Sequence, residues 1–341
     1  MDNFFEKSID KMRIKNPFNQ FKEEEVSFEW RKDPLISKTA RIIDSSIIFP
    51  DVPDLEELAI SSKKDCPFCP EQREKLTARF PEDLIPGGHL KYGECYLIPN
   101  ILPFSRYVGV IILSDEHFLH IDRFPSDVFT DGLILSKIFI EKLINQDGEV
   151  NYCSINWNYL PPAGSSIVHS HLQAVVGKEP TPYQKEVFDQ EKKYFIEHKN
   201  SFWEDFIKIE RKLKERFIME DEELFWTVSF SPFGMFPDIF VVFKNASSIF
   251  DIKEEIFKEF ARFATKIMKY LFTKNIYSFN MAVYLSVNNE ESYKVHARLT
   301  PRVSPRQVGN SDINYFQMLH GEGMCLKMPE KICSEIISFI N

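Results

Sequence analysis

Apolar positions along the chain recur with two periods, one typical of helices and one typical of strands. Helical spacing, with an apolar residue every three or four positions, runs over 124–145 and again over 252–269. Shorter runs rich in aliphatic and aromatic residues, bounded by turn-forming residues, are typical of strands. These runs lie at 40–43, 47–49, 94–99, 108–113, 150–159, 222–229, 238–243, 277–287 and 293–299. The pattern predicts an α+β protein with two long helices.

Polar segments flank these runs. The segment that ends near Glu25 is amphipathic and predicts a peripheral helix. Residues 51–64 predict a loop with a short acidic helix, since Pro50 and Pro53 punctuate it. Residues 186–216 are strongly charged and have helical spacing, which predicts a helical connection.

The order of the predicted elements occurs twice. In each half, strands are followed by one long helix and then by a last pair of strands. We therefore expect an internal duplication of an α+β unit, with His296 in the place that His169 or His171 has in the first half. The predicted domains are 27–180 and 221–341, preceded by a peripheral segment, 1–26, and joined by the connection 181–220.

The stretch from Gly164 to Gln173 carries the clearest candidate chemistry. If it is a strand, its period of two places His169, His171 and Gln173 on one face. A neutral histidine can attack phosphorus or bind a metal, and the turn at Gly164 can offer donors to anionic oxygens. The alternative is a strand with two half-exposed histidines beside a loop.

Composition and charge narrow the class of protein. With 341 residues and 43% hydrophobic content, the chain can bury a large core. It has 42 basic and 51 acidic residues, a net charge of −9, without a long run of like charge, which argues against a nucleic-acid or membrane partner. The N-terminal segment has the features of neither a signal peptide nor a membrane anchor, and no apolar window reaches the roughly 18 residues of a spanning helix. We expect a cytoplasmic protein whose six cysteines are reduced.

Two of these cysteines form a C-x-x-C turn, Cys66-Pro67-Phe68-Cys69. Such a turn can hold a metal, form a redox pair, or contain two unrelated buried thiols. Pro67 and Pro70 argue against a helix of the redox type that runs through Cys69, which favours a metal. His117, just past a strand end, is a candidate third ligand, although a lone histidine in a loop is more often solvated.

Together, the motifs resemble those of one family. Cys66-x-x-Cys69, Ser114-Asp115-Glu116-His117 and Gly164-Ser165-Ser166-x-x-His169-x-His171-x-Gln173 occur in this order. With Arg31-x-Asp33-Pro34-Leu35, Pro99-Asn100-Ile101-Leu102-Pro103, Ser231-Pro232-Phe233 and Val295-His296-Ala297-Arg298, they look like the galactose-1-phosphate uridylyltransferase family of the histidine-triad superfamily. The resemblance covers roughly residues 27 to 335 and implies two histidine-triad-like units, with antiparallel sheets and packed helices.

The resemblance also implies roles for individual residues. The residues that match the family's structural zinc ligands are Cys66, Cys69, His117 and His169. His171 matches a nucleophile that attacks the α-phosphorus of a nucleotide sugar to give a nucleotidyl-histidine. Such a histidine must be neutral, and its other nitrogen should donate to a backbone carbonyl.

Further residues match phosphate and nucleoside contacts of the family. Gln173 matches an amide that hydrogen-bonds the phosphoryl oxygen, and Gly164, Ser165 and Ser166 match the oxyanion-binding loop. Asn158 matches a phosphate contact and Asn100 a nucleoside contact. For both asparagines an ordinary turn residue is the alternative interpretation.

Departures from the family leave the substrate open. Ser170 stands where the family often has proline, a variant associated with ADP-glucose phosphorylase-like members, and no Ser-Pro-x-Arg element follows Pro34. Arg298 replaces a histidine of the second metal site, so we expect no iron. Residues 317–324 lack the lysine and tyrosine of the uridylyltransferases.

Three hypotheses follow. The first is a ping-pong nucleotidyltransferase with a nucleotide sugar and a phosphorylated acceptor as substrates. The second is a phosphorylase or hydrolase of nucleotide sugars or dinucleoside polyphosphates that uses the same histidine. The third is a zinc-containing nucleotide-binding protein without turnover, which the intact His171 and Gln173 disfavour. The resemblance also implies a homodimer.

Overall fold

A ten-stranded antiparallel sheet forms the body of the protein, which we describe from a computed structural model over residues 4–303 and 311–341. Its strand order is β4-β5-β6-β8-β7-β12-β13-β11-β10-β9. The first half of the chain contributes β4 (Leu90–Tyr92), β5 (Cys95–Pro99), β6 (Tyr107–Ile112), β7 (Tyr152–Tyr159) and β8 (His171–Gly177). The second half contributes β9 (Phe217–Glu220), β10 (Leu224–Val228), β11 (Ile239–Phe243), β12 (Ser278–Ser286) and β13 (His296–Arg302).

The two halves repeat one order of elements. Three strands precede a long helix and two strands follow it, with α3 (Ser126–Gln146) in the first half and α6 (Glu254–Thr273) in the second. The halves join where β7 pairs with β12, from Tyr152↔Ser286 to Tyr159↔Phe279, so both units share one sheet. The predicted α+β fold with antiparallel strands is confirmed.

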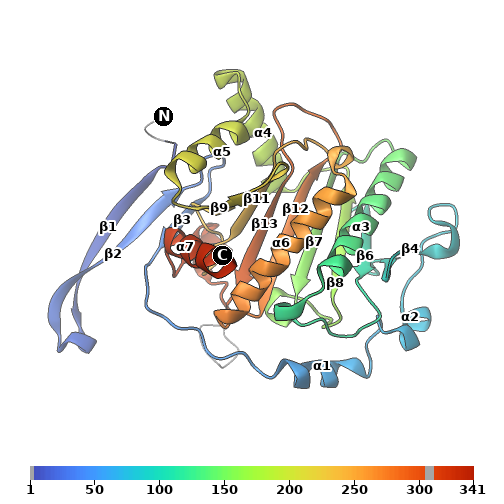
Figure 1. Ribbon diagram of the computed structural model, residues 1–341, viewed down its shortest axis with the longest axis horizontal. Coiled ribbons are helices and arrows are strands. Elements are labelled where there is room, and N and C mark those ends of the chain that lie inside the picture. The colour runs from blue at the N-terminus through green and yellow to red at the C-terminus, as the bar shows by residue number, and fades with distance from the viewer. Residues whose placement is uncertain (1–3, 304–310) are drawn as a thin grey trace.

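Both long helices cover the same face of this sheet, side by side (Figure 1). Each buries an apolar stripe at helical spacing, as the sequence predicts; in α3 this stripe includes Phe129, Leu133 and Leu143. Close approach depends on Gly132, because a Cβ there would lie 2.2 Å from Cδ2 of the buried Leu113. On the opposite face, α5 (Phe202–Leu213) packs against β10 and β11, and Phe68 packs against β5 and β6, so the polar side chains of this face lie at the centre of the sheet.

Shorter helices surround the sheet. They are α1 (Leu55–Lys63), α2 (Pro70–Leu76), α4 (Pro182–His198), α5 (Phe202–Leu213) and α7 (Pro329–Ile340). The predicted helical connection consists of α4 and α5, which are separated at Lys199, a residue in the left-handed conformation. Among the described helices, none combines the length and apolarity that crossing a bilayer demands.

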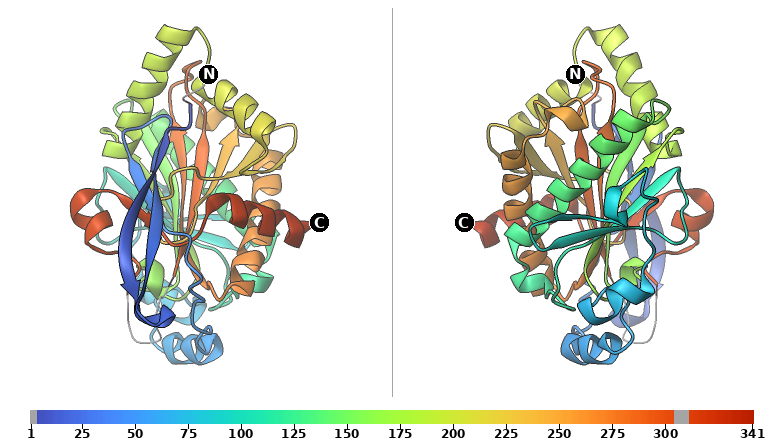
Figure 2. Two further views of the ribbon diagram at one scale, coloured as in Figure 1. Left: turned by 90° about the vertical axis from the view of Figure 1, so that its left-hand side faces the viewer. Right: turned by 90° about the vertical axis from the view of Figure 1, so that its right-hand side faces the viewer.

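The N-terminal segment corrects the prediction of a peripheral helix. It forms a long hairpin of β1 (Lys7–Asn16) and β2 (Lys22–Lys32), which extends along the outside of the molecule (Figures 1 and 2). Basic residues of β1 lie opposite acidic residues of β2. Lys11 also forms a diagonal ion pair with Glu25, at 2.9 Å. The helix prediction was wrong because the charged residues of this amphipathic segment form ion pairs between two strands.

The hairpin belongs to a second, four-stranded sheet. Its order is β1-β2-β3-β14, where β3 (Thr39–Ile42) lies parallel to β14 (Gly323–Cys325) from the other end of the chain. Residues 47–49, predicted as a strand, belong to neither sheet. The small sheet thus joins the two chain ends.

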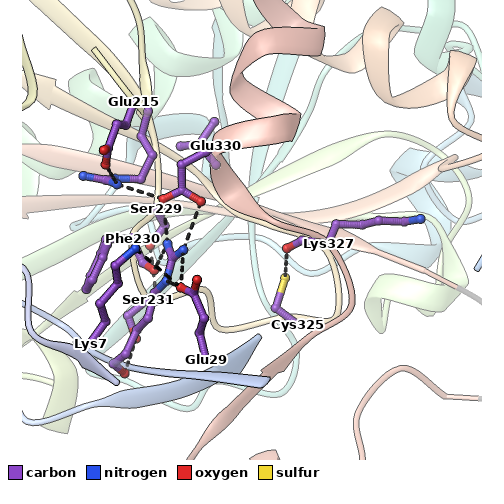
Figure 3. A network of polar contacts seen from close by, with 12 residues as sticks. Lys7, Glu29, Glu215, Ser229, Phe230, Ser231, Cys325, Lys327 and Glu330 are labelled. Atoms are coloured by element: carbon purple, nitrogen blue, oxygen red, sulfur yellow. Dashed lines mark hydrogen bonds and ion pairs between the residues drawn. The ribbon is translucent and has the colours of Figure 1, made fainter. Parts of the chain in front are cut away.

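Buried ion pairs anchor this small sheet to the second half (Figure 3). Both nitrogens at the end of the fully buried Arg31 donate to Glu330 at the start of α7, at 2.8 and 3.0 Å. Arg216, between α5 and β9, donates to the same carboxylate at 2.8 Å. One carboxylate therefore connects three segments that are far apart in the sequence.

Candidate active site and metal centre

The face of the large sheet opposite α3 and α6 carries rows of polar side chains at its centre. On β8, Leu172 is buried on the side of α3, so His171 and Gln173 face the other way. Gln173 is paired with Asn156 of β7, and Asn158 with Asn280 of β12. Continuing the β7–β8 register by two residues places Asn158 beside His171. The predicted residues of β7 and β8 therefore meet on one face.

The His171 ring is held in one tautomer. Its Nδ1 lies 2.8 Å from the carbonyl oxygen of His169, which can only accept, so Nδ1–H must donate and Nε2 has a free lone pair. Burial lowers the pKa of His171 below its usual value, which favours the neutral ring. The ring packs edge-on against Phe68, at 5.1 Å between centroids. A neutral imidazole with one free nitrogen is what nucleophilic attack needs.

Next to this ring, Cys66, Cys69, His117 and His169 form a buried cluster whose ligand atoms all lie within 4.8 Å of one another. The Cys69 sulfur lies 3.3 Å from Nδ1 of His117 and 3.7 Å from Nδ1 of His169, and the Cys66 sulfur 3.6 Å from the latter. Sulfur and nitrogen ligands of a tetrahedral zinc ion are roughly 3.5 Å apart. The cluster therefore fits a four-coordinate metal.

Neighbouring groups orient both histidines for metal binding through Nδ1. Nε2 of His169 lies 2.9 Å from the carbonyl oxygen of Ser114, and Nε2 of His117 lies 3.0 Å from the Ser62 hydroxyl. With the proton on Nε2, each Nδ1 has a lone pair for the metal, as is usual for histidine ligands. Burial lowers the pKa of His169 to about 4, which also favours the neutral ring.

The C-x-x-C turn ends at a helix. Cys69 is the N-cap of α2, and Pro70 is its first residue, where proline needs no amide hydrogen. Arg73 of α2 donates to the carbonyl of Phe68 at 2.9 Å and to Asp115 at 2.7 Å. Since Asp115 precedes the His117 loop, this arginine holds the two ligand-bearing segments together.

The loop before the histidines has a constrained backbone. Leu160 has a φ of 67° and a ψ of 166°, a conformation that is costly for a residue with a side chain, and Gly164 has a φ of 85°. The buried hydroxyl of Ser165 donates to the carbonyl of Ile167 at 2.7 Å and so braces the loop, whereas Gly164 and Ser166 are exposed. Of the two serines, Ser166 has the hydroxyl that faces solvent.

Asn100 lies apart from the other predicted residues. It follows β5, two strands away from β8, and its Oδ1 accepts a hydrogen bond from the amide of Leu102 at 2.9 Å. The turn that it forms presents Ile101, Leu102 and Phe104, all exposed apolar residues, to solvent. The structure therefore brings together His171, Gln173 and Asn158, with Asn100 at the edge of this face.

Sequence reasoning missed three polar residues of this face. Asn156 donates to the carbonyl of Gln173 at 3.3 Å, Asn280 donates to Asn158 at 2.7 Å, and Arg302 donates to Asn280 at 2.9 Å. The available signal was the alternation along β12, where Asn280, Ala282 and Tyr284 are interleaved with buried apolar residues.

The second half has a histidine in the place of His171. His296 is the first residue of β13, and its Nδ1 lies 3.0 Å from the carbonyl oxygen of Lys294, two residues earlier, as in His171. Unlike His171, it is enclosed by aromatic rings, among them Trp203 at 5.1 Å and Tyr284 at 5.0 Å. Burial lowers its pKa to about 3. This histidine is a packed core residue.

Models of known protein families give no match to the chain. A relative described as an uncharacterized protein of Archaeoglobus fulgidus is 29% identical over 315 residues, which cover 92% of this chain and 93% of that protein.

Solved structures share the fold over about nine-tenths of the chain. A galT-like protein from Arabidopsis thaliana has a TM-score of 0.68 at 20% identity and covers 90% of this chain and 98% of its own. An ADP-glucose phosphorylase from Arabidopsis thaliana, with bound ADP-glucose, has a TM-score of 0.68 at 18% identity and the same coverage. A uridylyltransferase has a TM-score of 0.66 at 13% identity and covers 91% and 98%. The resemblance predicted from the motifs is thus confirmed in the fold, and this chain has the α+β fold of the galT-like proteins and uridylyltransferases.

Proposed function

We propose that this protein belongs to the galactose-1-phosphate uridylyltransferase family and is a nucleotidyltransferase. In this proposal a nucleoside monophosphate moves between a nucleotide sugar and a phosphorylated acceptor through a covalent bond to His171. The observation that carries the proposal is the hydrogen bond from Nδ1 of His171 to the His169 carbonyl, which leaves the lone pair of Nε2 for attack. The fold shared with an ADP-glucose phosphorylase supports it.

The proposed reaction has two steps. In the first, Nε2 of His171 attacks the α-phosphorus; a P–N bond forms, and the P–O bond to the bridging oxygen breaks, so that the sugar phosphate leaves. In the second, an oxygen of the acceptor phosphate attacks the same phosphorus and the P–N bond breaks. Nδ1 keeps its proton throughout, because the His169 carbonyl stabilises the charge on the substituted ring.

Side chains around His171 would bind the phosphoryl oxygens. Gln173 is partly exposed on the same face, and Asn158, which the extended β7–β8 register places beside His171, has an exposed side chain. The backbone amide of Ser166 is a further donor in the proposal, whereas the amide of Gly164 already donates to the carbonyl of Pro161 at 2.8 Å. Asn100 with its apolar turn would contact the nucleoside. Donors that are already in place cost no reorganisation when charge develops on the phosphoryl group.

The metal in the Cys66, Cys69, His117 and His169 cluster is proposed to be zinc, in a structural role. Two thiolates and two imidazoles form a closed tetrahedral set, which has no position for substrate. Bound zinc would stabilise the thiolates, although burial and then the neighbouring Cys66 raise the pKa of Cys69 to about 11. Its effect on the reaction is indirect, since His169 supplies the carbonyl that orients His171.

Metal analysis of the purified protein tests this assignment. We expect about one zinc ion per chain and no iron, and we expect zinc to be lost in the double variant Cys66→Ser, Cys69→Ser. The variant Cys95→Ser is a matched control, because Cys95 is also buried but lies outside the cluster. A folded wild-type protein without zinc, purified in the absence of chelators, would contradict the assignment.

Mass spectrometry of the intact protein tests the covalent step. Wild-type protein is incubated with UDP-glucose, ADP-glucose or diadenosine tetraphosphate, without an acceptor. We expect a mass increase of one nucleoside monophosphate, which the variant His171→Ala lacks and the variant His296→Ala, if folded, retains. If none of the three donors labels the wild-type protein, the proposed function fails.

Addition of candidate acceptors to the labelled protein identifies the acceptor. Labelled protein is mixed with inorganic phosphate, a hexose 1-phosphate or buffer, and the loss of label is timed. Rapid loss of the label after addition of the hexose phosphate indicates a transferase. Rapid loss after addition of phosphate indicates a phosphorylase, and rapid loss in buffer alone indicates a hydrolase. A phosphorylase is the second candidate, which the fold shared with ADP-glucose phosphorylase favours.

A homodimer is part of the proposal. Tyr315, Met318 and Leu319 expose large apolar surfaces on the helical turn η6 (Phe316–His320), which lies on the opposite side of the large sheet from α6 (Figure 2). Such a patch beside the candidate site suits a contact with a second copy. A monomeric mass in light scattering at micromolar concentration would contradict it.

A further inference from the structure

Four polar side chains form one hydrogen-bonded chain that leads from the second half of the fold to the candidate site. Asp312 holds Arg302 through both carboxylate oxygens, at 2.6 to 3.0 Å. Arg302 donates to Oδ1 of Asn280 at 2.9 Å, and Asn280 donates to Oδ1 of Asn158 at 2.7 Å. We call these four residues the relay.

Arg302 determines the orientation of the Asn280 amide. A guanidinium group can only donate, so the Asn280 oxygen must face it. The Asn280 amino group then donates to two acceptors, Oδ1 of Asn158 and the carbonyl oxygen of Ala163 at 2.8 Å. The flipped amide would place N–H groups against N–H groups and oxygen against oxygen. The contacts with Arg302, which can only donate, and with the Ala163 carbonyl, which can only accept, therefore fix the orientation of Asn280.

The orientation of Asn280 determines that of Asn158. Because Oδ1 of Asn158 accepts from Asn280, its amino group points away from Asn280. This side chain is exposed, and continuing the pairing of β7 with β8 by two residues beyond Asn156↔Gln173 places it beside His171. Asn158 thus presents two N–H donors to the region where the proposed phosphoryl group would lie.

Attraction of a negatively charged phosphate does not explain the position of Arg302. Its side chain is only 12% exposed, and its charge is neutralised by Asp312, whose carboxylate also accepts from the amide of Val303 at 3.0 Å. An arginine that served to attract a phosphate would need to reach it with its own N–H groups. The structure assigns Arg302 to orientation instead.

We propose that Asn280 and Arg302 are positioning residues that hold Asn158 as a hydrogen-bond donor toward the transferred phosphoryl group. Through this relay, the second half of the duplicated fold controls the active site of the first. Asn280 also binds the carbonyl of Ala163, so it holds the turn that precedes Gly164. The inference rests on the function proposed above.

The isosteric variant Asn280→Asp tests the relay. A carboxylate keeps the contact with Arg302, but its second oxygen accepts where the amino group donated, so the Asn158 amide must turn over. Its carbonyl oxygen would then face the phosphoryl oxygens. We expect the rate of His171 labelling by UDP-glucose or ADP-glucose, whichever labels the wild type, to fall by about 10²–10³. We expect the apparent donor affinity to change much less.

A double-variant cycle separates orientation from added negative charge. Asn158→Ala alone should slow labelling to a similar degree, and Asn280→Asp should have a much smaller further effect in that background, where it acts only through its contact with the Ala163 carbonyl. If the added charge alone is responsible, the two effects will multiply. Arg302→Lys retains a donor to Asn280 and should keep more activity than Arg302→Met. Asn151→Asp, an exposed position outside the relay, is the control with unchanged activity.

The outcomes distinguish the relay from the proposed function. If wild-type protein is not labelled, the nucleotidyltransferase proposal fails. If wild-type protein is labelled and folded Asn280→Asp reacts at the wild-type rate, the relay is wrong and the proposed function stands. Circular dichroism establishes folding; should Asn280→Asp not fold, the comparison of Asn158→Ala with Arg302→Met decides, and full activity of both overturns the relay.

Discussion

At the residue scale, Ser170 has a buried hydroxyl without a partner. It lies between His169 and His171, only 4% of its surface is exposed, and its Oγ has no hydrogen-bond partner among the described residues. A buried hydroxyl left unsatisfied costs about 1–3 kcal/mol. The position between the two histidines is therefore not optimised for stability.

We predict that Ser170→Ala raises the free energy of unfolding by about 1 kcal/mol, because the alanine removes the unsatisfied hydroxyl and leaves little empty space. Urea denaturation at neutral pH measures the change. Ser165→Ala is the matched control five residues earlier, where the hydroxyl donates to the carbonyl of Ile167 at 2.7 Å, and it should lower the free energy by about 1 kcal/mol. Equal losses in both variants would show that Ser170 is satisfied in solution.

At the scale of elements, β14 is positioned by a glycine. A Cβ on Gly323 would lie 2.1 Å from the backbone carbonyl oxygen of Pro232 and 3.2 Å from Cβ of Ala40 on the neighbouring β3. A side chain could rotate away, but a backbone carbonyl and a paired strand cannot move independently. The parallel pairing of β3 and β14 thus requires that Gly323 has no side chain.

We predict that Gly323→Ala lowers the free energy of unfolding by about 1–3 kcal/mol, because β14 must move away from Pro232. Chemical denaturation measures it. Gly148→Ala is the control, since a Cβ there meets no atom within 4 Å, and it should be within about 0.5 kcal/mol of wild type. Wild-type stability of Gly323→Ala would mean that the contact between β14 and Pro232 is looser than in this structure.

At the scale of the whole molecule, Glu330 connects the N-terminal hairpin, the connection between the halves, and the C-terminal helix. Burial alone would raise its pKa, but hydrogen bonds and charge attraction from Arg31 and then Arg216 lower the pKa to about 2. Because the pKa is depressed on folding, the contribution to stability is complete above the usual value near 4.5 and is lost as the pH falls toward 2.

We predict that Glu330→Gln lowers the free energy of unfolding by about 2–3 kcal/mol at pH 7, since Arg31 and Arg216 lose a shared carboxylate. Between pH 4.5 and 2 the wild type should lose more stability than the variant, so that the difference between them shrinks. Denaturation at pH 7 and pH 3 checks both statements. On the same helix, Glu335→Gln removes an exposed ion pair with Lys274 and should cost at most about 1 kcal/mol. A constant difference across this pH range would contradict the linkage.

Local patterns in the sequence were sufficient for much of the fold and part of the site. The spacing of apolar residues determined α3, α6 and most central strands, because each must bury one face against a common core. The spacing of Cys66 and Cys69 indicated a metal turn, since two residues between cysteines allow both sulfurs to face one ion. The alternation around His171 placed it with Gln173, as the strand shows.

Only the tertiary structure decided the contacts that depend on register between distant strands. The sequence by itself contained the charges of β1 and β2, but it did not show that they would pair across a hairpin rather than along a helix. It contained Asn280 and Arg302, yet their contact with Asn158 follows from the pairing of β7 with β12, which joins the two halves. A one-residue shift in that pairing would turn Asn280 to the other face, so no local pattern can specify the relay.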